Sequence, residues 1–308
     1  MVQNNCIQMR SEYNGKPVAV VECKKECCCN RDITMIEFMM ITKSNTAKGY
    51  LSDLNKGFKK WGINTCIEKA CFIAHTLKET ANYTLLEEIL VDPKDEELNY
   101  KGYKGRGLMQ LTFEENYAAY GIAVANDRNK FLGKNKDLIS KDKAHAVGSA
   151  LWYWKEHRKL TNYALSNDFI TTCAIINGGF NGFIDRKNFY KKALVAFNVK
   201  ECVNLDKKVI NMLYGYLPFE ESYVYKYLIA ETFGWGLWHD PDSKRKGTKK
   251  ELKEAKKGYT RFLELVEGKI YPFGFNKTKK QERKSYGYTG TSAVNYAKNW
   301  LIKYEKSI

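Results

Sequence analysis

FIAHTLKET (residues 72–80) and YKGRGLMQLTFEENY (residues 103–117) are the two stretches that decide the fold of this chain. The first closes an amphipathic helix, because apolar residues recur at helical spacing from Ile67 to Leu77. Glu79 lies near the end of that helix, with His75 one turn earlier on the same face. The second stretch alternates polar and apolar residues, which is typical of a strand. An acidic helix end and a strand-like run therefore lie close together in the sequence.

Further carboxylates lie between these two stretches. Glu87 and Glu88 follow within a short apolar segment, and Glu96 and Glu97 lie on a loop rich in acids. Two carboxylates on opposite sides of a cleft suit the hydrolysis of a sugar polymer, because one donates a proton while the other activates water. Residue type alone favours a plainer interpretation, in which these acids are solvated surface groups.

A glycine-arginine loop opens the second stretch. Gly105 and Gly107 permit a tight backbone path around Arg106. The planar guanidinium of an arginine can hold a carboxylate in place through two parallel hydrogen bonds. This short pattern is weak evidence by itself, and its meaning depends on the acids around it.

Helical patterns dominate the chain, so the sequence predicts a mainly α protein. Thr34 and Ser140 are candidate N-caps, and Asn177-Gly178-Gly179 is a stop signal for a helix. The predicted helices cover residues 34–41, 50–61, 67–79, 141–157, 168–176, 183–197, 221–233, 249–267 and 291–305.

Composition shifts divide the chain into three parts. Residues 1–31 form an N-terminal extension that holds one candidate strand, GKPVAVVEC at 15–23, and several cysteines. Residues 32–204 form the main helical domain. Residues 205–308 form a Lys- and Tyr-rich helical region, which is an accessory or wall-binding module or else part of the core.

The composition is that of a globular and strongly basic protein. Of its 308 residues 44% are hydrophobic, and 51 Lys and Arg against 35 Asp and Glu give a net charge of +16. This charge favours an anionic partner, although a lysine-rich solvated surface would produce it equally. We predict neither nucleic acid nor a membrane span, because no nucleic-acid motif and no long apolar run is present. The N-terminus lacks an ordinary secretory signal, so we expect synthesis in the cytoplasm.

Nine cysteines, an odd number, favour synthesis in a reducing compartment. Four of them crowd together as Cys23, Cys27, Cys28 and Cys29. A zinc site is conceivable, but the sequence offers neither paired Cys-x-x-Cys elements nor a nearby histidine. We therefore predict no metal and no cofactor, and we leave open the formation of disulfides after export.

The C-terminal region contains one compact aromatic group, formed by Trp235, Trp238 and His239. Such a group could serve as a sugar platform. Clustered aromatic side chains more often build a core, so the sequence favours packing.

Five segments in this order and spacing resemble glycoside hydrolase family 19, which contains chitinases and the lysozyme-like endolysins of bacteria and phages. They are FIAHTLKET, YKGRGLMQLTFEENY, ALWYW (150–154), IINGG (175–179) and DRKNFY (185–190). The likeness spans about residues 50–198. It implies a mainly α, two-lobed, lysozyme-like fold with a deep substrate cleft, to which this chain adds its helical C-terminal region.

The resemblance also implies an inverting mechanism with two carboxylates. Glu79 occupies the position of the general acid, and Glu88 matches the second carboxylate best. Thr112 matches the hydroxyl that helps to hold the nucleophilic water. The alternatives for the second carboxylate are Glu87 and, more remotely, Glu96 and Glu97.

Other family positions line the sugar sites or brace the carboxylates. The candidates for substrate binding are His75, Tyr103, Gln110, Asn116, Tyr117 and Asn177, and the candidates for bracing are Arg106 and Arg186. By residue type alone His75 would be a plain helix-surface or groove-lining histidine.

An inverting glycosidase needs one protonated and one ionised carboxyl group. We expect Glu79 to be partly shielded and protonated, and Glu88 to be solvated or paired with a cation. The family usually has a histidine just before the acid, where this chain has Lys78. If Lys78 approached Glu79, its charge would oppose proton donation.

We interpret the chain as a peptidoglycan hydrolase that cleaves β-1,4 bonds between N-acetylated amino sugars, as an antibacterial toxin or an endolysin. A basic protein gains association rate on an anionic wall, which favours peptidoglycan over chitin. The alternatives are a chitinase and a non-catalytic glycan-binding protein. We expect a monomer that acts at the cell wall of a target or host cell, on the glycan strand, with an immunity protein as partner if it is a toxin delivered by a type VI secretion system.

Overall fold

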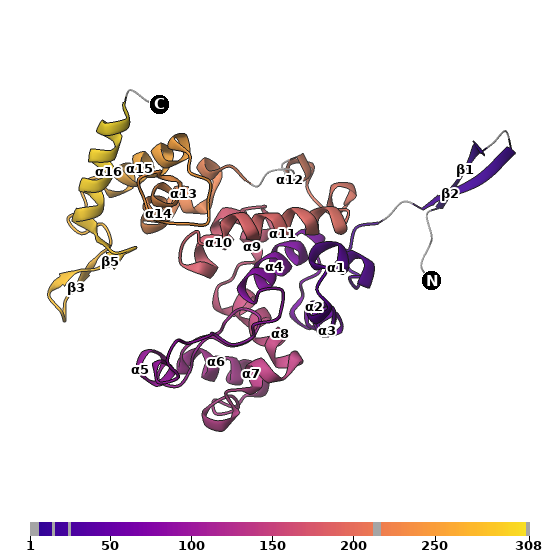
Figure 1. Cartoon of the computed structure of the whole chain (residues 1–308), viewed down its shortest axis with the longest axis horizontal. Coiled ribbons are helices and arrows are strands. Elements are labelled where there is room, and N and C mark those ends of the chain that lie inside the picture. The colour runs from indigo at the N-terminus through magenta and orange to yellow at the C-terminus, as the bar shows by residue number, and fades with distance from the viewer. Residues whose placement is uncertain (1–5, 14–15, 24–25, 212–216, 306–308) are drawn as a thin grey trace.

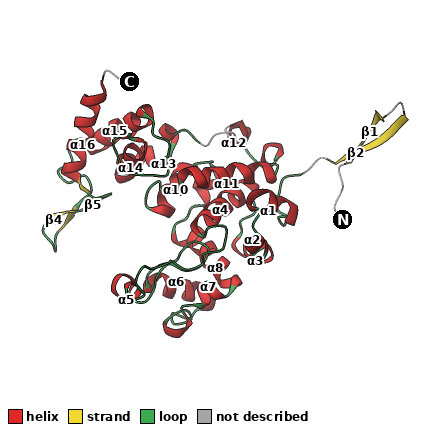
Figure 2. Ribbon diagram, in the orientation of Figure 1, coloured by secondary structure: helices red, strands yellow, loops and turns green. Residues whose placement is uncertain are grey.

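The structure is a computed structural model that describes residues 6–13, 16–23, 26–211 and 217–305. It is mainly α, as the sequence predicts, and Figure 2 shows helices throughout the body of the molecule. β1 (Cys6–Tyr13) and β2 (Lys16–Cys23) form an antiparallel hairpin, which confirms the strand predicted in GKPVAVVEC. Among the described residues no helix is both long and apolar enough to cross a membrane.

The first helices begin and end where their capping residues predict. Thr34 caps α1 (Met35–Thr42) through a complete capping box with Glu37. α2 (Asn45–Lys48) follows, and α3 (Leu51–Trp61) ends at Gly62, whose φ of 66° suits a glycine. α4 (Cys66–Glu79) is the central helix, since every residue from Cys66 to Leu77 is buried. Glu79 is its last residue and lies at its half-exposed end.

The helix predicted over residues 141–157 consists of separate pieces. α7 (Leu138–Lys141) contains Ser140, and α8 (Lys143–Trp152) begins after Asp142, whose carboxylate accepts the His145 N–H at 3.0 Å. The N-cap prediction for Ser140 is therefore wrong, because the aspartate two residues later caps the longer helix. α8 then continues as a π-helix over Tyr153–His157. The remaining helices of this part are α5 (Asp95–Tyr100), α6 (Glu114–Ala125), α9 (Thr161–Leu165), α10 (Phe169–Asn177) and α11 (Phe183–Ala196).

Two hydrophobic clusters divide the helical domain into two lobes. The larger cluster surrounds α4 and includes α1, α3, α8, α10 and α11. The smaller cluster lies between α6, α7 and the end of α8, and it contains Leu111, Tyr117, Tyr120, Phe131, Ile139 and Trp152. Figure 1 shows α5, α6 and α7 together on one side of the α4–α11 body. The two-lobed organisation expected from the sequence is thus visible in the packing.

The C-terminal region shares the larger core with the helical domain. Its helices are α12 (Lys207–Asn211), α13 (Tyr223–Tyr227), α14 (Ile229–His239), α15 (Leu252–Val266) and α16 (Gly290–Tyr304), with the short hairpins β3–β4 (Phe275–Asn276, Gln281–Glu282) and β5–β6 (Lys284–Ser285, Tyr288–Thr289). The ring of Trp235 on α14 contacts Phe180 and Phe183 edge-on. The Asp168 carboxylate accepts the Tyr223 N–H at 2.7 Å. The core is therefore continuous between α10, α11 and α14.

The aromatic group at the end of α14 is part of this core. Trp235, Trp238 and His239 are only 2%, 1% and 6% exposed. Next to them the fully buried Asp240 accepts hydrogen bonds from Tyr259, Tyr296 and Trp300. The interpretation of the group as packing is confirmed, and Asp240 ties α14 to α15 and α16.

Candidate active site

Three extended segments bring the acidic and the hydroxyl residues together. Isolated bridges pair Glu87 with Arg106 and Arg106 with Leu111. Backbone hydrogen bonds of 2.9 Å from Glu88 N to Gly105 O and of 3.0 Å from Arg106 N to Leu111 O hold the segments side by side. The candidate base Glu88 and the candidate hydroxyl Thr112 thus lie on the two outer segments of one small ladder. Period-two alternation predicted the 109–113 run, but its pairing with residue 106 is visible only in the structure.

Glu79 meets a buried arginine at the end of α4. Its Oε1 accepts a hydrogen bond of 2.5 Å from Arg186 Nη2, which comes from α11. The Glu79 side chain is 17% exposed, so it is partly shielded, and that of Arg186 is 2% exposed. A charge-assisted contact of this kind fixes the orientation of the carboxylate. Arg186, which the sequence predicts to brace a carboxylate, therefore contacts Glu79 directly.

His75 supports Arg186 from inside the core. Arg186 Nη1 donates to His75 Nδ1 at 3.2 Å, which leaves Nε2 to carry the ring proton and donate to Thr172 Oγ1 at 3.0 Å. The Thr172 hydroxyl in turn donates a hydrogen bond to the Phe169 carbonyl at 2.9 Å. His75 was expected among the substrate-binding residues, but its side chain is fully buried. It positions Arg186 and does not reach a substrate.

The neutral state of His75 makes the stability of the fold depend on pH. Burial lowers the pKa of His75 well below its ordinary value of 6.5, and the charge of Arg186 lowers it further. Below the ordinary pKa of histidine, His75 binds a proton in the unfolded chain but not in the folded chain. The free energy of unfolding therefore decreases as pH falls. We expect His75 to contribute a loss of about 1.4 kcal/mol in the free energy of unfolding between about pH 7.5 and about pH 5.5.

Urea unfolding of the wild type and of His75→Gln at both pH values measures this contribution. The other three histidines also have lowered pKa values and remain in both proteins. The difference between the two pH dependences therefore isolates His75. Equal losses in both proteins would show that His75 is protonated in the folded state.

Glu87 belongs to a network of cations. Ser140 Oγ donates to its Oε1 at 2.6 Å, and Lys104 Nζ lies 3.2 Å from its Oε2. Burial would raise the pKa of Glu87, but the hydrogen bonds of Ser140 and Lys104 and the charge of Arg106 outweigh burial and lower it. Glu87 is therefore held as an ionised partner of these cations.

Arg106 is the centre of that network. Its Nη2 lies 2.8 Å from Glu96 Oε1 and 3.2 Å from Asp137 Oδ1, and its side chain is 3% exposed. Burial would raise the pKa of Glu96, but Arg106 and Lys136 outweigh it and the pKa is lowered. Glu96 thus serves Arg106, while Glu97 is exposed on α5. The contacts of Arg106 are thus to Glu96 and Asp137, and its ion pairs among the described residues include neither Glu79 nor Glu88.

Glu88 has neutral donors instead of cations. Tyr100 OH donates to its Oε1 at 2.8 Å, and the Gly105 N–H donates to its Oε2 at 3.3 Å. Successive side chains of an extended segment point to opposite faces, which explains why Glu87 and Glu88 have different partners. Within the described part of the chain no cation lies at ion-pair distance from the Glu88 carboxylate, which these two neutral donors orient instead.

Thr112 and its neighbours form a rigid turn beside this ladder. Thr112 Oγ1 donates to the Gln110 carbonyl at 2.9 Å, and Asn116 Nδ2 donates to the Thr112 carbonyl at 2.7 Å. Gln110 Nε2 donates to the Gly107 carbonyl at 3.1 Å. The φ of Gln110 is 51°, in the left-handed region that non-glycine residues rarely adopt. Such local strain is typical of a functional site.

The other predicted substrate-binding residues lie in two places. Tyr117 is fully buried, and its hydroxyl donates to the Lys104 carbonyl at 2.7 Å, so it supports the loop from inside. Tyr103 is half-buried and packs edge-on against Tyr117. Asn177 ends α10, and its Oδ1 accepts the Asn181 N–H at 3.1 Å. Tyr103 and Asn177 are therefore the two of this group with exposed surface to offer a ligand.

Lys78 has a partner of its own. Its Nζ lies 2.8 Å from Asp185 Oδ2, in an ion pair whose side chains are 36% and 56% exposed. The aliphatic part of Lys78 packs over Gly182 at the start of α11. The ammonium group is thus engaged by the residue that precedes Arg186, while Arg186 itself contacts Glu79.

This arrangement predicts that Lys78 is dispensable for catalysis. Lys78→Ala should change kcat/KM for glycan hydrolysis less than about tenfold, and the free energy of unfolding by no more than about 1 kcal/mol, because the lost ion pair is exposed. Turnover assays and urea unfolding check both values. A loss of about a hundredfold or more would mean that Lys78 acts on the catalytic acid.

Several supporting residues could not be identified from the sequence. Ser140 reaches Glu87 across 53 residues, and Tyr100 reaches Glu88 from α5. Tyr153 opens the π-helix, and burial raises its pKa, with the charge of Glu79 adding to that rise. π-helical turns are frequent at functional sites. The only signal for Tyr153 in the sequence is its place in the ALWYW segment.

Comparisons with known proteins agree with the resemblance seen in the sequence. A family model described as chitinase class I, that of glycoside hydrolase family 19, matches residues 38–173. A glycosyl hydrolase family 19 domain-containing protein of Haemophilus influenzae is 35% identical over 100 residues, which cover 31% of this chain and 43% of that protein. The acidic endochitinase SP2 of Beta vulgaris is 32% identical over 156 residues, which cover 45% and 52%. The chain thus spans about half of the length of the curated relatives it matches.

Solved structures of two chitinases are also similar to this chain. A bacterial family 19 chitinase aligns with a TM-score of 0.46 and 21% identity, covering 56% of this chain and 98% of that one. Chitinase C from Streptomyces griseus aligns with a TM-score of 0.44 and 23% identity, covering 54% and 92%. The segment matched by the family model contains Glu79, Glu88, Arg106 and Thr112. Residues 38–173 of this chain are therefore similar to glycoside hydrolase family 19.

Proposed function

We propose that this chain is an inverting glycosidase that cleaves β-1,4 bonds between N-acetylated amino sugars. The observation that carries the proposal is the contrast between two carboxylates. Glu79 is shielded at a helix end against the buried Arg186, while Glu88 lies on an extended segment and accepts hydrogen bonds from neutral donors. Two carboxyl groups in different surroundings suit separate acid and base roles. The guanidinium of Arg186 by itself favours the ionised form of Glu79, so on this proposal the bound substrate must exclude water from Glu79 and thereby favour its protonated form.

Each residue then has one task in the reaction. Arg186 contacts Oε1 of Glu79, which leaves Oε2 to carry the proton for the leaving oxygen. Glu88 takes a proton from the water that attacks the anomeric carbon on the opposite face of the sugar. Thr112 donates to the Gln110 carbonyl, so the lone pairs of its hydroxyl oxygen are directed to accept a hydrogen bond from that water. His75 and Tyr100 hold Arg186 and Glu88 in position.

The net charge of +16 supports peptidoglycan as the substrate. Bacterial walls carry acidic lactyl-peptide groups, and a basic protein associates faster with an anionic polymer. On this proposal the protein is an antibacterial lytic enzyme, a delivered toxin or an endolysin, that acts at the cell wall of a target or host cell. An immunity protein would be its partner in the toxin case.

Chitin is the second candidate substrate, because the curated relatives include plant endochitinases. Chitin shares the β-1,4 linkage and the N-acetyl groups of peptidoglycan but lacks its acidic substituents. The two candidates therefore differ in how strongly salt should slow the enzyme, since screening weakens the attraction between a basic protein and an anionic polymer.

Mass spectrometry of products tests the proposal. Purified peptidoglycan and chitin hexamer are incubated in parallel with the wild type and with Glu79→Gln. Muropeptides with new reducing ends from the wild type alone would support a peptidoglycan glycosidase, and the sugar at that end would name the bond. Soluble products from chitin alone would make the protein a chitinase. Binding to either polymer without any product would replace the proposal by a glycan-binding role.

A further inference from the structure

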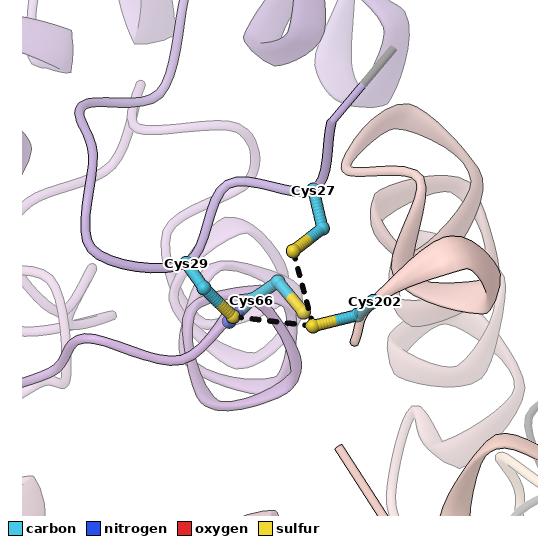
Figure 3. Close-up of side chains that lie close together, drawn as sticks. All are labelled: Cys27, Cys29, Cys66 and Cys202. Atoms are coloured by element: carbon cyan, nitrogen blue, oxygen red, sulfur yellow. Dashed lines mark hydrogen bonds between the residues drawn. The ribbon is translucent and has the colours of Figure 1, made fainter. Parts of the chain in front are cut away.

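Four cysteines from three distant parts of the chain meet beside the first turn of α4. Cys27 and Cys29 come from the loop after the N-terminal hairpin, Cys66 is the first residue of α4, and Cys202 follows the 3-10 helix Val199–Glu201. Their four sulfur atoms all lie within 4.8 Å of one another. Figure 3 shows the four side chains pointing toward a common centre.

The sulfur separations lie on both sides of, and within about 1 Å of, the edge length expected for tetrahedral coordination of one metal ion. With zinc–sulfur bonds of about 2.3 Å, the edges of a sulfur tetrahedron measure about 3.8 Å. The sulfur of Cys202 lies 3.0 Å from that of Cys27 and 3.4 Å from that of Cys29, and the remaining separations reach no further than 4.8 Å. These distances exceed the length of a disulfide bond, about 2.05 Å. The cluster is therefore a set of four thiols around a point that one ion could share.

The surroundings hold the cluster in place. The Cys66 N–H donates to the Cys29 sulfur at 3.1 Å. Lys69 is buried, and its Nζ donates to the carbonyls of Cys28 and Arg31 at 2.8 Å each. Arg31 Nε donates to the Cys27 carbonyl at 3.1 Å. Two cations thus fasten the loop that carries two of the thiols.

Lys69 also offsets part of the charge of the occupied site. Four thiolates around a divalent ion carry a net negative charge, which a buried site tolerates only with compensation nearby. Lys69 lies within the first turn of α4 and supplies a positive charge there, whereas the charge of Arg31 is already paired with Glu37 at 2.7 Å. Cys66 and Cys202 are 0% and 1% exposed. The site is therefore mostly enclosed, as structural zinc sites are.

We propose that Cys27, Cys29, Cys66 and Cys202 form a structural zinc site that ties the N-terminal loop and the chain after α11 to the start of α4. Soft thiolate ligands in a tetrahedral set select zinc among the common divalent ions. The ion would join the segments before α1 and after α11 to the start of α4, the helix that ends at Glu79. The prediction of no metal rested on the local spacing of Cys23, Cys27, Cys28 and Cys29. In the structure Cys27 and Cys29 lie beside Cys66 and Cys202, so the candidate ligand set differs from the local cluster.

Metal analysis of the full chain, purified without chelators, tests the proposal. We expect about one zinc per chain for a closed four-cysteine site. Cys202→Ala should lose the metal, and Cys202→His, which restores a ligand, should keep it. Cys28→Ala is the matched control, because Cys28 lies between two of the ligands and its buried side chain packs in the hydrophobic core. It should retain zinc as the wild type does.

Cobalt substitution gives a readout that does not depend on any variant. Wild-type protein loaded with Co²⁺ should show the thiolate-to-cobalt charge-transfer absorption and the visible bands of tetrahedral cobalt.

A chelator should lower the thermal midpoint of the wild type and of Cys28→Ala, and should leave that of Cys202→Ala unchanged. Glu79→Gln should bind zinc like the wild type, so loss of hydrolysis and loss of metal remain separate results.

Three outcomes would overturn the proposal. The wild type could fail to bind stoichiometric zinc or cobalt after reconstitution under reducing conditions. Cys202→Ala could keep as much metal as the wild type. Mass analysis under non-reducing conditions could show two disulfides among these four cysteines in protein made in a reducing compartment, which would make the cluster a redox-linked clamp.

Discussion

Glu79→Gln is expected to lower kcat/KM for glycan hydrolysis by about 10²- to 10⁴-fold, the range that general acid catalysis contributes. Glutamine keeps the shape of the side chain and an oxygen that can still accept the hydrogen bond from Arg186. It removes the proton that the leaving oxygen requires. Because little packing changes, the urea midpoint should stay close to that of the wild type. Release of reducing ends from peptidoglycan or chitin oligomers measures the loss.

Glu115→Gln provides the matched control for the change in charge. Glu115 lies in the first turn of α6, and its side chain is exposed. It should lose no more than about twofold in kcat/KM, since surface substitutions away from a site have small effects. Near-normal turnover by Glu79→Gln would assign the proton to another group. A large drop in its urea midpoint would instead mean that the carboxylate mainly stabilises the buried Arg186.

Much of the helical framework could be predicted because its signals are local. Thr34 caps α1, Gly62 ends α3 and Gly178 ends α10, each with the conformation that its residue type favours. The stripe from Ile67 to Leu77 located α4 within one residue of its observed bounds. The position of Glu79 at the end of that helix followed from the same stripe.

The contacts that give the acids their separate characters could not be predicted. Glu87 and Glu88 are neighbours, and only the pairing of residues 86–88 with the Gly105–Gly107 loop turns one toward Lys104 and the other toward Tyr100. The spacing of residues along the chain does not show which extended segment pairs with which. The residue type of an acid therefore names a candidate, and its partners decide its role.

The spacing of the cysteines did not identify the four that meet in the structure, for the same physical reason. The local cluster includes Cys28, which faces the core, and it omits Cys66 and Cys202, which lie 37 and 173 residues from Cys29. Zinc ligands from one short segment leave a recognisable repeat, whereas ligands gathered from three elements do not. The burial of His75 was hidden in a similar way, because α4 is covered on nearly all sides by helices that are distant in the sequence.

The choice between Glu88 and Glu87 as the base leads to the second large expected effect. Glu88→Gln should lower kcat/KM by about 10²- to 10⁴-fold, because the amide cannot take the proton from the attacking water. Glu87→Gln should cost less than about tenfold, since it keeps an acceptor for Ser140 and weakens only the pair with Lys104. Parallel turnover assays of the two variants, which carry the same substitution one residue apart, separate the roles.

The stereochemistry of the wild-type product supplies an independent check on the same assignment. An inverting enzyme releases the α-anomer first from a β-linked glycan, because water attacks directly from the face opposite the leaving group. Time-resolved proton NMR of chitin-hexamer or muropeptide cleavage shows which anomer forms before mutarotation. A β-anomer as first product would mean that a carboxylate attacks as nucleophile and not as base. If Glu87→Gln abolished turnover while Glu88→Gln retained it, the base would be Glu87, and the cations around it would serve to keep that carboxylate ionised for attack on water.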